Sequence, residues 1–159
     1  MMRLRFDRAL AKDSTLAFAR LALGAGFLSA VADRFGLWGP YGTQGVAWGD
    51  FDHFLVYTHH LTSVLSVRVS DALGVVATSA EIVLGFLLLL GLRIRLISLL
   101  SGFLLLSFGT AMAAAIGPKS PLDASVFSAA AAALVISFHD ADRFTLDAFQ
   151  SVMWSNRHR

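Results

Sequence analysis

The chain of 159 residues contains no cysteine and carries little charge. The absence of cysteine excludes a disulfide framework, a thiolate metal site and thiol redox chemistry within this sequence. Charged residues make up only 15% of the chain, against roughly 25% in an ordinary soluble domain. Hydrophobic residues make up 56%, and the mean hydropathy is +0.66. These values indicate a single domain that is solvated by lipid.

Four apolar segments approach the length of about 20 residues that a membrane-spanning helix needs. The pair Gly117-Pro118 predicts the end of the third segment. Ser120 is then expected to be the N-cap of the fourth, with Pro121 at the first position and Asp123 at the third. We therefore expect an all-α fold, an integral membrane four-helix bundle that forms one membrane domain over residues 1–159. The predicted spans are 16–35, 72–92, 96–116 and 122–138.

The distribution of positive charge predicts how the bundle is oriented. Ten of the thirteen Lys and Arg residues precede or open the first span, connect the second to the third, or follow the fourth. Because cytoplasmic loops carry an excess of Lys and Arg, both termini are predicted to be cytoplasmic. The first apolar run is too long for a cleaved signal peptide, and we expect it to remain as an anchor. The net charge of +2 gives no reason to expect nucleic acid as a partner.

Two further segments are amphipathic rather than spanning. The long outer connection, residues 36–71, begins with a stretch rich in glycine and aromatic residues. Its second part, residues 50–69, alternates apolar and polar side chains, which predicts a helix lying in the outer membrane interface. The cytoplasmic tail, residues 140–159, places apolar residues among charges, and we expect it to form a second surface helix.

Ionisable residues inside the spans are the strongest functional signal, because each is costly in lipid unless it is paired. Glu81 lies near the middle of the second span, with Thr78 on its face. Arg20 lies about one turn inside the first span, at a height that predicts an Arg20–Glu81 pair in the core. This pair has two interpretations. It is either a structural contact that fixes helix register or a site where Glu81 exchanges a proton beside a quinone or another lipid-soluble substrate.

Other polar residues carry weaker signals. Asp33 and Arg34, at the outer end of the first span, are expected to reach the headgroups more often than to form a site. His53 and His60 share a helix face near two aspartates, but solvated interface histidines are the more common case, so no metal site is predicted. A stripe on the third span is typical of a packing face more than of a channel; it consists of Ser98, Gly102, Gly109 and Ala113.

Three motifs, taken in order, resemble the DoxX-like family of small bacterial membrane proteins. Each motif is short and apolar, but their order and spacing extend over most of residues 16–138. They are Arg20–Gly24 leading to Asp33–Gly36, then Ala80–Gly85 followed by Gly91-Leu92 and Arg95, and finally Gly117–Asp123 with Ser125–Phe127.

The resemblance implies a four-helix bundle in the bacterial cytoplasmic (inner) membrane and a link to membrane oxidoreductases. The family name comes from a subunit associated with a thiosulfate:quinone oxidoreductase. By position, Arg20, Glu81 and Arg95 match polar residues that the family pattern places in its helices. Relatives linked to disulfide handling are poor models, because this chain has no cysteine.

Three functions follow as hypotheses. The first is a membrane subunit of a quinone-linked oxidoreductase, with Arg20, Glu81 and Thr78 at the quinone site. Asp33, Arg34 and Arg95 are secondary candidates, and electrons would come from a partner protein because the sequence carries no redox cofactor motif. The second is a non-catalytic accessory or assembly subunit, held by other membrane subunits or by copies of itself. The third is a small oligomeric transporter or channel.

Overall fold

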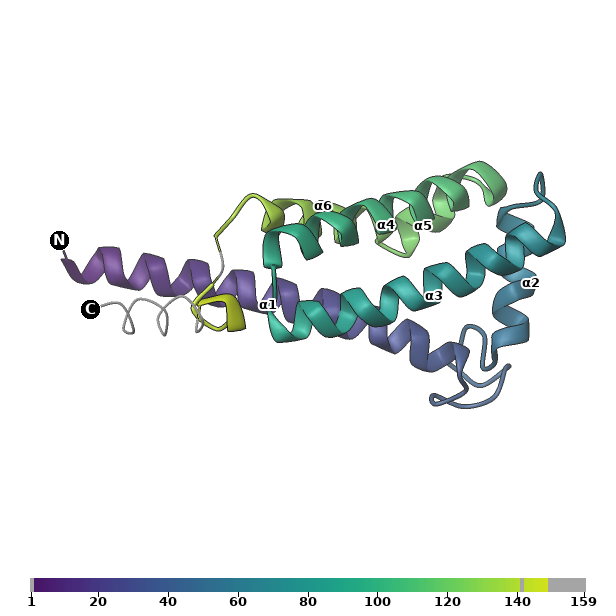
Figure 1. Cartoon of the computed structure of the whole chain (residues 1–159), viewed down its shortest axis with the longest axis horizontal. Helices are drawn as coiled ribbons and strands as arrows, with labels where there is room; N and C mark the ends of the chain where they lie inside the picture. Colours follow the sequence, from purple (N-terminus) through teal and green to yellow (C-terminus); the bar gives the residue numbers. More distant parts are fainter. Residues whose placement is uncertain (1, 141, 149–159) are drawn as a thin grey trace.

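The computed structural model describes residues 2–140 and 142–148, and it places them in six helices with no strand among them (Figure 1). The all-α prediction is confirmed. The helices are α1 (Met2–Arg34), α2 (Phe51–Leu61), α3 (Val67–Leu90), α4 (Ile94–Ile116), α5 (Lys119–Asp123) and α6 (Val126–Ser137).

Three of these helices are long and apolar enough to cross a membrane. They are α1 over residues 8–34, α3 and α4, with mean hydropathies of 1.6, 2.2 and 2.0. Helix α6 is apolar but has only 12 residues. At about 1.5 Å per residue it extends about 18 Å, against the roughly 30 Å of a bilayer core. The chain is therefore a helical bundle of multi-pass membrane type, in which the fourth apolar helix is shorter than a full span.

The predicted fourth span, residues 122–138, is wrong as a single helix. Helix α5 ends at Asp123, and Ser125 adopts a left-handed conformation with φ of 55°. This conformation interrupts the helical path, so α6 starts only at Val126. The predicted N-cap, Ser120, lies inside α5 instead of starting the apolar helix.

The outer connection contains the predicted helix in a shorter form. Helix α2 ends at Leu61, and a turn leads into α3, which begins at Val67 rather than at residue 72. Asp50 caps α2 by accepting a hydrogen bond of 2.8 Å from the backbone N–H of His53. That bond is the main reason why the pKa of Asp50 lies below its usual value.

The segments predicted to be cytoplasmic lie together at one end of the bundle. Residues 142–148 lie at the end where α1 extends beyond the other helices, and α2 lies at the opposite end (Figure 1). Arg143 Nε donates to Asp13 Oδ2 at 2.6 Å and joins the tail to α1. The side of the membrane that this end faces stays a prediction. The predicted tail helix falls mostly outside the described residues, which show one helical turn from Leu146 to Ala148.

The bundle consists of two helix pairs, α1 with α3 and α4 with α6. A Cβ added to Gly24 of α1 would lie 2.9 Å from the carbonyl oxygen of Gly85 of α3. The two backbones therefore cross in a contact that only small residues permit.

The second pair has the same kind of contact. A Cβ at Gly102 or at Gly109 of α4 would lie 2.7 Å from a side chain of α6, Leu134 or Phe127 respectively. These contacts confirm that the stripe of small residues on α4 is a packing face.

We predict that Gly24→Leu destabilises the fold by about 1–3 kcal/mol, because its side chain overpacks the α1–α3 crossing. Gly26→Leu is the matched control, since a Cβ at Gly26 meets no atom within 4 Å. Thermal unfolding in detergent should show a lower midpoint for Gly24→Leu only. Equal midpoints for the two variants would contradict the crossing.

Candidate functional site

A pocket of about 990 Å³ lies between the two helix pairs, with α2 and the outer connection contributing to its wall. The wall is mostly apolar. Helix α1 lines it with a row of residues that recur every fourth position, so that neighbours in the row lie about one turn apart. These residues are Phe18, Ala22, Gly26, Ala30 and Arg34. The pocket thus follows α1 from its middle to the end at which α2 lies.

Arg34, the last residue of α1, places a buried positive charge at the α2 end of the pocket. Its Nη1 donates to Thr78 Oγ1 at 2.8 Å and forms a buried ion pair with Glu81. The guanidinium carbon lies 3.9 Å from the ring centre of Phe54 and 5.4 Å from that of Trp48. Glu81 compensates the charge, and the two aromatic rings add cation–π attraction in a site closed to water.

Two nitrogens of this arginine, Nε and Nη2, have no hydrogen-bond partner among the described residues. Arg34 is 3% exposed, and its Nε–H makes no hydrogen bond to any of the residues that the structure describes. A buried donor without a partner is uncommon in native structures, because it loses its hydration without replacement. Arg34 lines the pocket, but Nε itself has no accessible surface, so the part of the guanidinium left for a ligand is Nη2.

Asp33 supports the site from the next position. Its carboxylate accepts backbone hydrogen bonds from Ala47 at 2.8 Å, from Gly49 at 3.2 Å and from Trp48 at 3.4 Å. These bonds hold the outer connection against α1, and they keep the Trp48 ring beside Arg34. The expectation that Asp33 and Arg34 reach the headgroups is wrong, because both side chains are buried.

Helix α2 supplies aromatic residues that the sequence analysis missed. Phe54 and Tyr57 line the pocket together with Trp48, although this segment was expected to lie in the outer membrane interface. Burial raises the pKa of the Tyr57 hydroxyl. The available signal was the turn spacing of Phe54, Tyr57 and Thr58, which gives α2 one face directed at the bundle.

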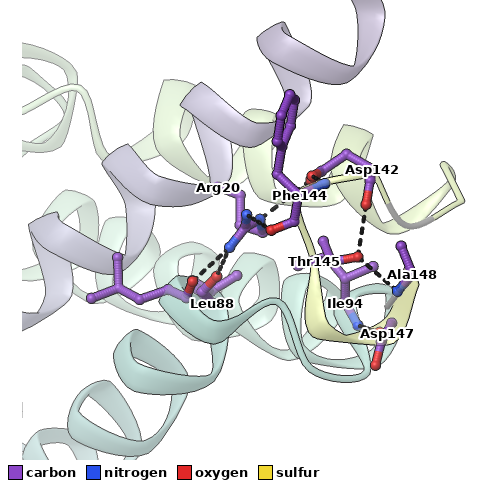
Figure 2. A network of polar contacts seen from close by, with 9 residues as sticks. Arg20, Leu88, Ile94, Asp142, Phe144, Thr145, Asp147 and Ala148 are labelled. Carbon is purple, nitrogen blue, oxygen red and sulfur yellow. Dashed lines mark hydrogen bonds and ion pairs between the residues drawn. The ribbon is translucent and has the colours of Figure 1, made fainter. Parts of the chain in front are cut away.

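Arg20 belongs to a different network, at the opposite end of α3 (Figure 2). Its Nη1 donates to the carbonyl oxygens of Leu88 and Leu89, the latter at 2.8 Å. Its Nε donates to Asp142 Oδ2 and its Nη2 to the Phe144 carbonyl oxygen, both at 3.3 Å. Arg20 therefore binds two carbonyl groups at the C-terminus of α3 and the chain that follows α6.

The predicted Arg20–Glu81 pair is wrong, and the helix crossing gives the physical reason. In antiparallel helices that meet at Gly24 and Gly85, a residue one turn before Gly24 faces the turn after Gly85. Arg20 consequently meets the end of α3, whereas Glu81 lies one turn away on the other side of the crossing. Arg34 reaches Glu81 from the opposite direction.

The segment of residues 140 and 142–148, here called the C-terminal strap, is held by several polar contacts. Asp147 caps α4 by accepting from the backbone N–H groups of Arg93 at 2.9 Å and Ile94 at 3.0 Å. Arg95 forms an exposed ion pair with Asp140. Arg95, a secondary candidate, therefore lies beside the strap and not at the pocket.

The outer histidines lie in two separate pairs. His53 Nδ1 is 2.8 Å from Asp50, and His59 Nε2 is 2.6 Å from Asp71. No group of three His, Cys, Asp or Glu side chains converges within residues 2–140 and 142–148. His53 and His59 thus each have a single acidic partner at the outer end.

Comparisons of the chain with models of known families, with curated proteins and with solved structures find no match. The resemblance to the DoxX-like family stays a prediction. The case for a function accordingly rests on the pocket and on the residues that line it.

We predict that substitutions of Arg34 and Glu81 are coupled in their effect on the free energy of unfolding, whereas substitutions of Arg20 and Glu81 are independent. Removing one member of the buried pair, by Arg34→Met or Glu81→Leu, should cost about 3–5 kcal/mol, because the other charge is left uncompensated. The double variant should recover part of that loss. Arg20→Met combined with Glu81→Leu should instead be additive within about 0.5 kcal/mol.

Denaturant titration in mixed micelles measures these energies. A coupling between Arg20 and Glu81 that exceeds the coupling between Arg34 and Glu81 would contradict the observed pairing.

Proposed function

We propose that this chain is a membrane subunit of a quinone-linked oxidoreductase in the bacterial cytoplasmic membrane, and that the pocket between the helix pairs receives the quinone. The observation that carries the proposal is the buried Arg34–Glu81–Thr78 group at one end of a long apolar pocket. Amphipathic ligands need this combination of a few fixed polar groups in an apolar wall. The choice of a quinone comes from the DoxX-like resemblance, and the pocket supports it.

The residues of the site suggest which group would bind the quinone ring and which would transfer a proton. A bound quinone would take electrons from a partner protein and protons from its surroundings. Arg34 would hold the polar ring by hydrogen bonding and would keep Glu81 in place. Glu81, the carboxyl group of this set, would hold or release a proton at its Oε atoms. Arg20, named in the first hypothesis, plays no part here, because it lies at the other end of α3.

The strap lies at the end of the bundle away from Arg34, and it is a surface on which a partner protein could dock. Electrons must arrive from a partner, and the strap presents an exposed Phe144 at the end of the bundle away from α2. This exposed group on a well-anchored segment favours a second candidate function, a non-catalytic accessory or assembly subunit. In that case the strap would be the docking surface, and the pocket would contain structural lipid.

Glu81→Gln tests the proposal, because it keeps the shape of the side chain and removes its proton exchange. We expect quinone-dependent turnover in membranes carrying the variant to fall by about 100-fold or more, the usual contribution of a general acid or base. Ser79→Ala is the matched control on the same helix, since the exposed Ser79 hydroxyl bonds only to Val75 of its own helix.

Affinity purification of the same two variants separates the candidate functions. Loss of turnover with the partner still bound supports the quinone site. Unchanged turnover in Glu81→Gln, with a stoichiometric partner retained, would remove the quinone site and leave the accessory subunit.

A further inference from the structure

Polar and apolar groups are separated along the length of the pocket. The polar groups gather around Arg34, whereas the α1 face from Ala30 back to Phe18 contributes only apolar atoms. From Phe18 to Arg34 the helix rises about 24 Å, at about 1.5 Å per residue. A compact ligand would leave most of this length empty, so the shape fits a molecule with a small polar head and one long hydrocarbon chain.

The charges around Arg34 define the head. Arg34 and Glu81 compensate each other, and the Asp33 carboxylate is already bonded to three backbone N–H groups. An anionic head would meet the Glu81 carboxylate, and a cationic head would meet the guanidinium. Nη1 is occupied by Thr78 and Glu81, and Nε has no accessible surface, so the donors left for a ligand are the Nη2 N–H groups. They need an acceptor and not a charge. A neutral carbonyl oxygen meets this requirement.

The sides of the pocket suggest how such a molecule enters. Several lining residues are exposed on the flanks of the spanning helices, among them Phe18 on α1 and Val76 on α3. In a membrane bundle these flanks face lipid. A ligand that is dissolved in the bilayer can therefore enter from the side, without passing through water.

We propose that the pocket binds a neutral, single-chain carbonyl amphiphile, with its carbonyl oxygen accepting from Arg34 Nη2 and its chain lying along α1 toward Phe18. The inference rests on the proposed function in taking the same pocket, and it defines the class of ligand. A long-tailed quinone and a fatty acyl ester share this chemistry, and the experiment distinguishes them.

Calorimetric titration of the detergent-purified chain with five compounds tests the class of ligand. The compounds are a decyl-substituted benzoquinone, methyl palmitate, palmitate at pH 8, hexadecane and methyl butyrate. We expect the first two to bind at least tenfold more tightly than palmitate or hexadecane, since only they combine a neutral acceptor with a chain. Methyl butyrate, which lacks the chain, should bind at least tenfold more weakly than methyl palmitate.

Two variants test the two ends of the site. Arg34→Lys keeps the positive charge but has no second nitrogen equivalent to Nη2, so both carbonyl ligands should lose about tenfold in affinity, with hexadecane unchanged. Gly26→Leu places a side chain in the path of the hydrocarbon chain, where a Cβ meets no protein atom. It should weaken methyl palmitate at least tenfold and leave methyl butyrate unchanged. Ala25→Leu, at an exposed position outside the pocket lining, is the control.

The outcomes separate this inference from the proposed function. Suppose that methyl palmitate binds and is weakened by both Arg34→Lys and Gly26→Leu, but the quinone does not bind. The inference then stands and the quinone-linked function fails. If the quinone binds equally well to the wild-type chain and to both variants, the inference is overturned and the proposed function survives. Tighter binding of palmitate than of methyl palmitate would also overturn it, because the head would then be anionic. Should Arg34→Lys fail to fold, the Gly26→Leu result decides.

Discussion

The close crossing of α1 and α3 at Gly24 and Gly85 is the constraint on which the rest of the structure depends. With no side chain between the two backbones, the helices approach closely and their register is fixed. This register assigns a partner to each arginine of α1. Arg20 meets the carbonyl groups at the end of α3, and Arg34 meets Glu81 from the other direction. One contact between two glycines thus decides where both buried charges are compensated.

The two arginines serve the fold in different ways. Arg20 joins α1, the end of α3 and the strap in a network whose hydrogen bonds are mostly to backbone oxygens, and each of its guanidinium nitrogens has a partner (Figure 2). Arg34 lies in an apolar pocket, between a carboxylate and two aromatic rings, and its Nε and Nη2 make no hydrogen bond to the described residues. A buried ion pair is weak evidence for stability alone, because desolvation offsets much of its attraction. The unused Nη2 donors and the pocket that Arg34 lines are what distinguish the Arg34 end as a binding site.

The sequence predicts the long helices well, because hydropathy and length determine which segments lipid can solvate. It also identifies Glu81 and Thr78 as members of a buried polar group. It fails where a single backbone angle matters, as at Ser125, and where register decides the partner. Arg20 and Arg34 lie on the same face of α1, so sequence spacing alone offers Glu81 two partners. The roles of Trp48 and Phe54 depend on the outer connection folding back onto α1 through Asp33, which no local pattern reveals.

Cross-linking in native membranes measures the register most directly, and the absence of cysteine provides a clean background. Leu28 packs against Gly85 in the observed crossing. In the alternative register, which would place Arg20 beside Glu81, Leu28 would lie near Gly74 instead. The account predicts a disulfide between Leu28→Cys and Gly85→Cys on mild oxidation, and none between Leu28→Cys and Gly74→Cys. The opposite result would contradict the register, and with it the Arg34–Glu81 site.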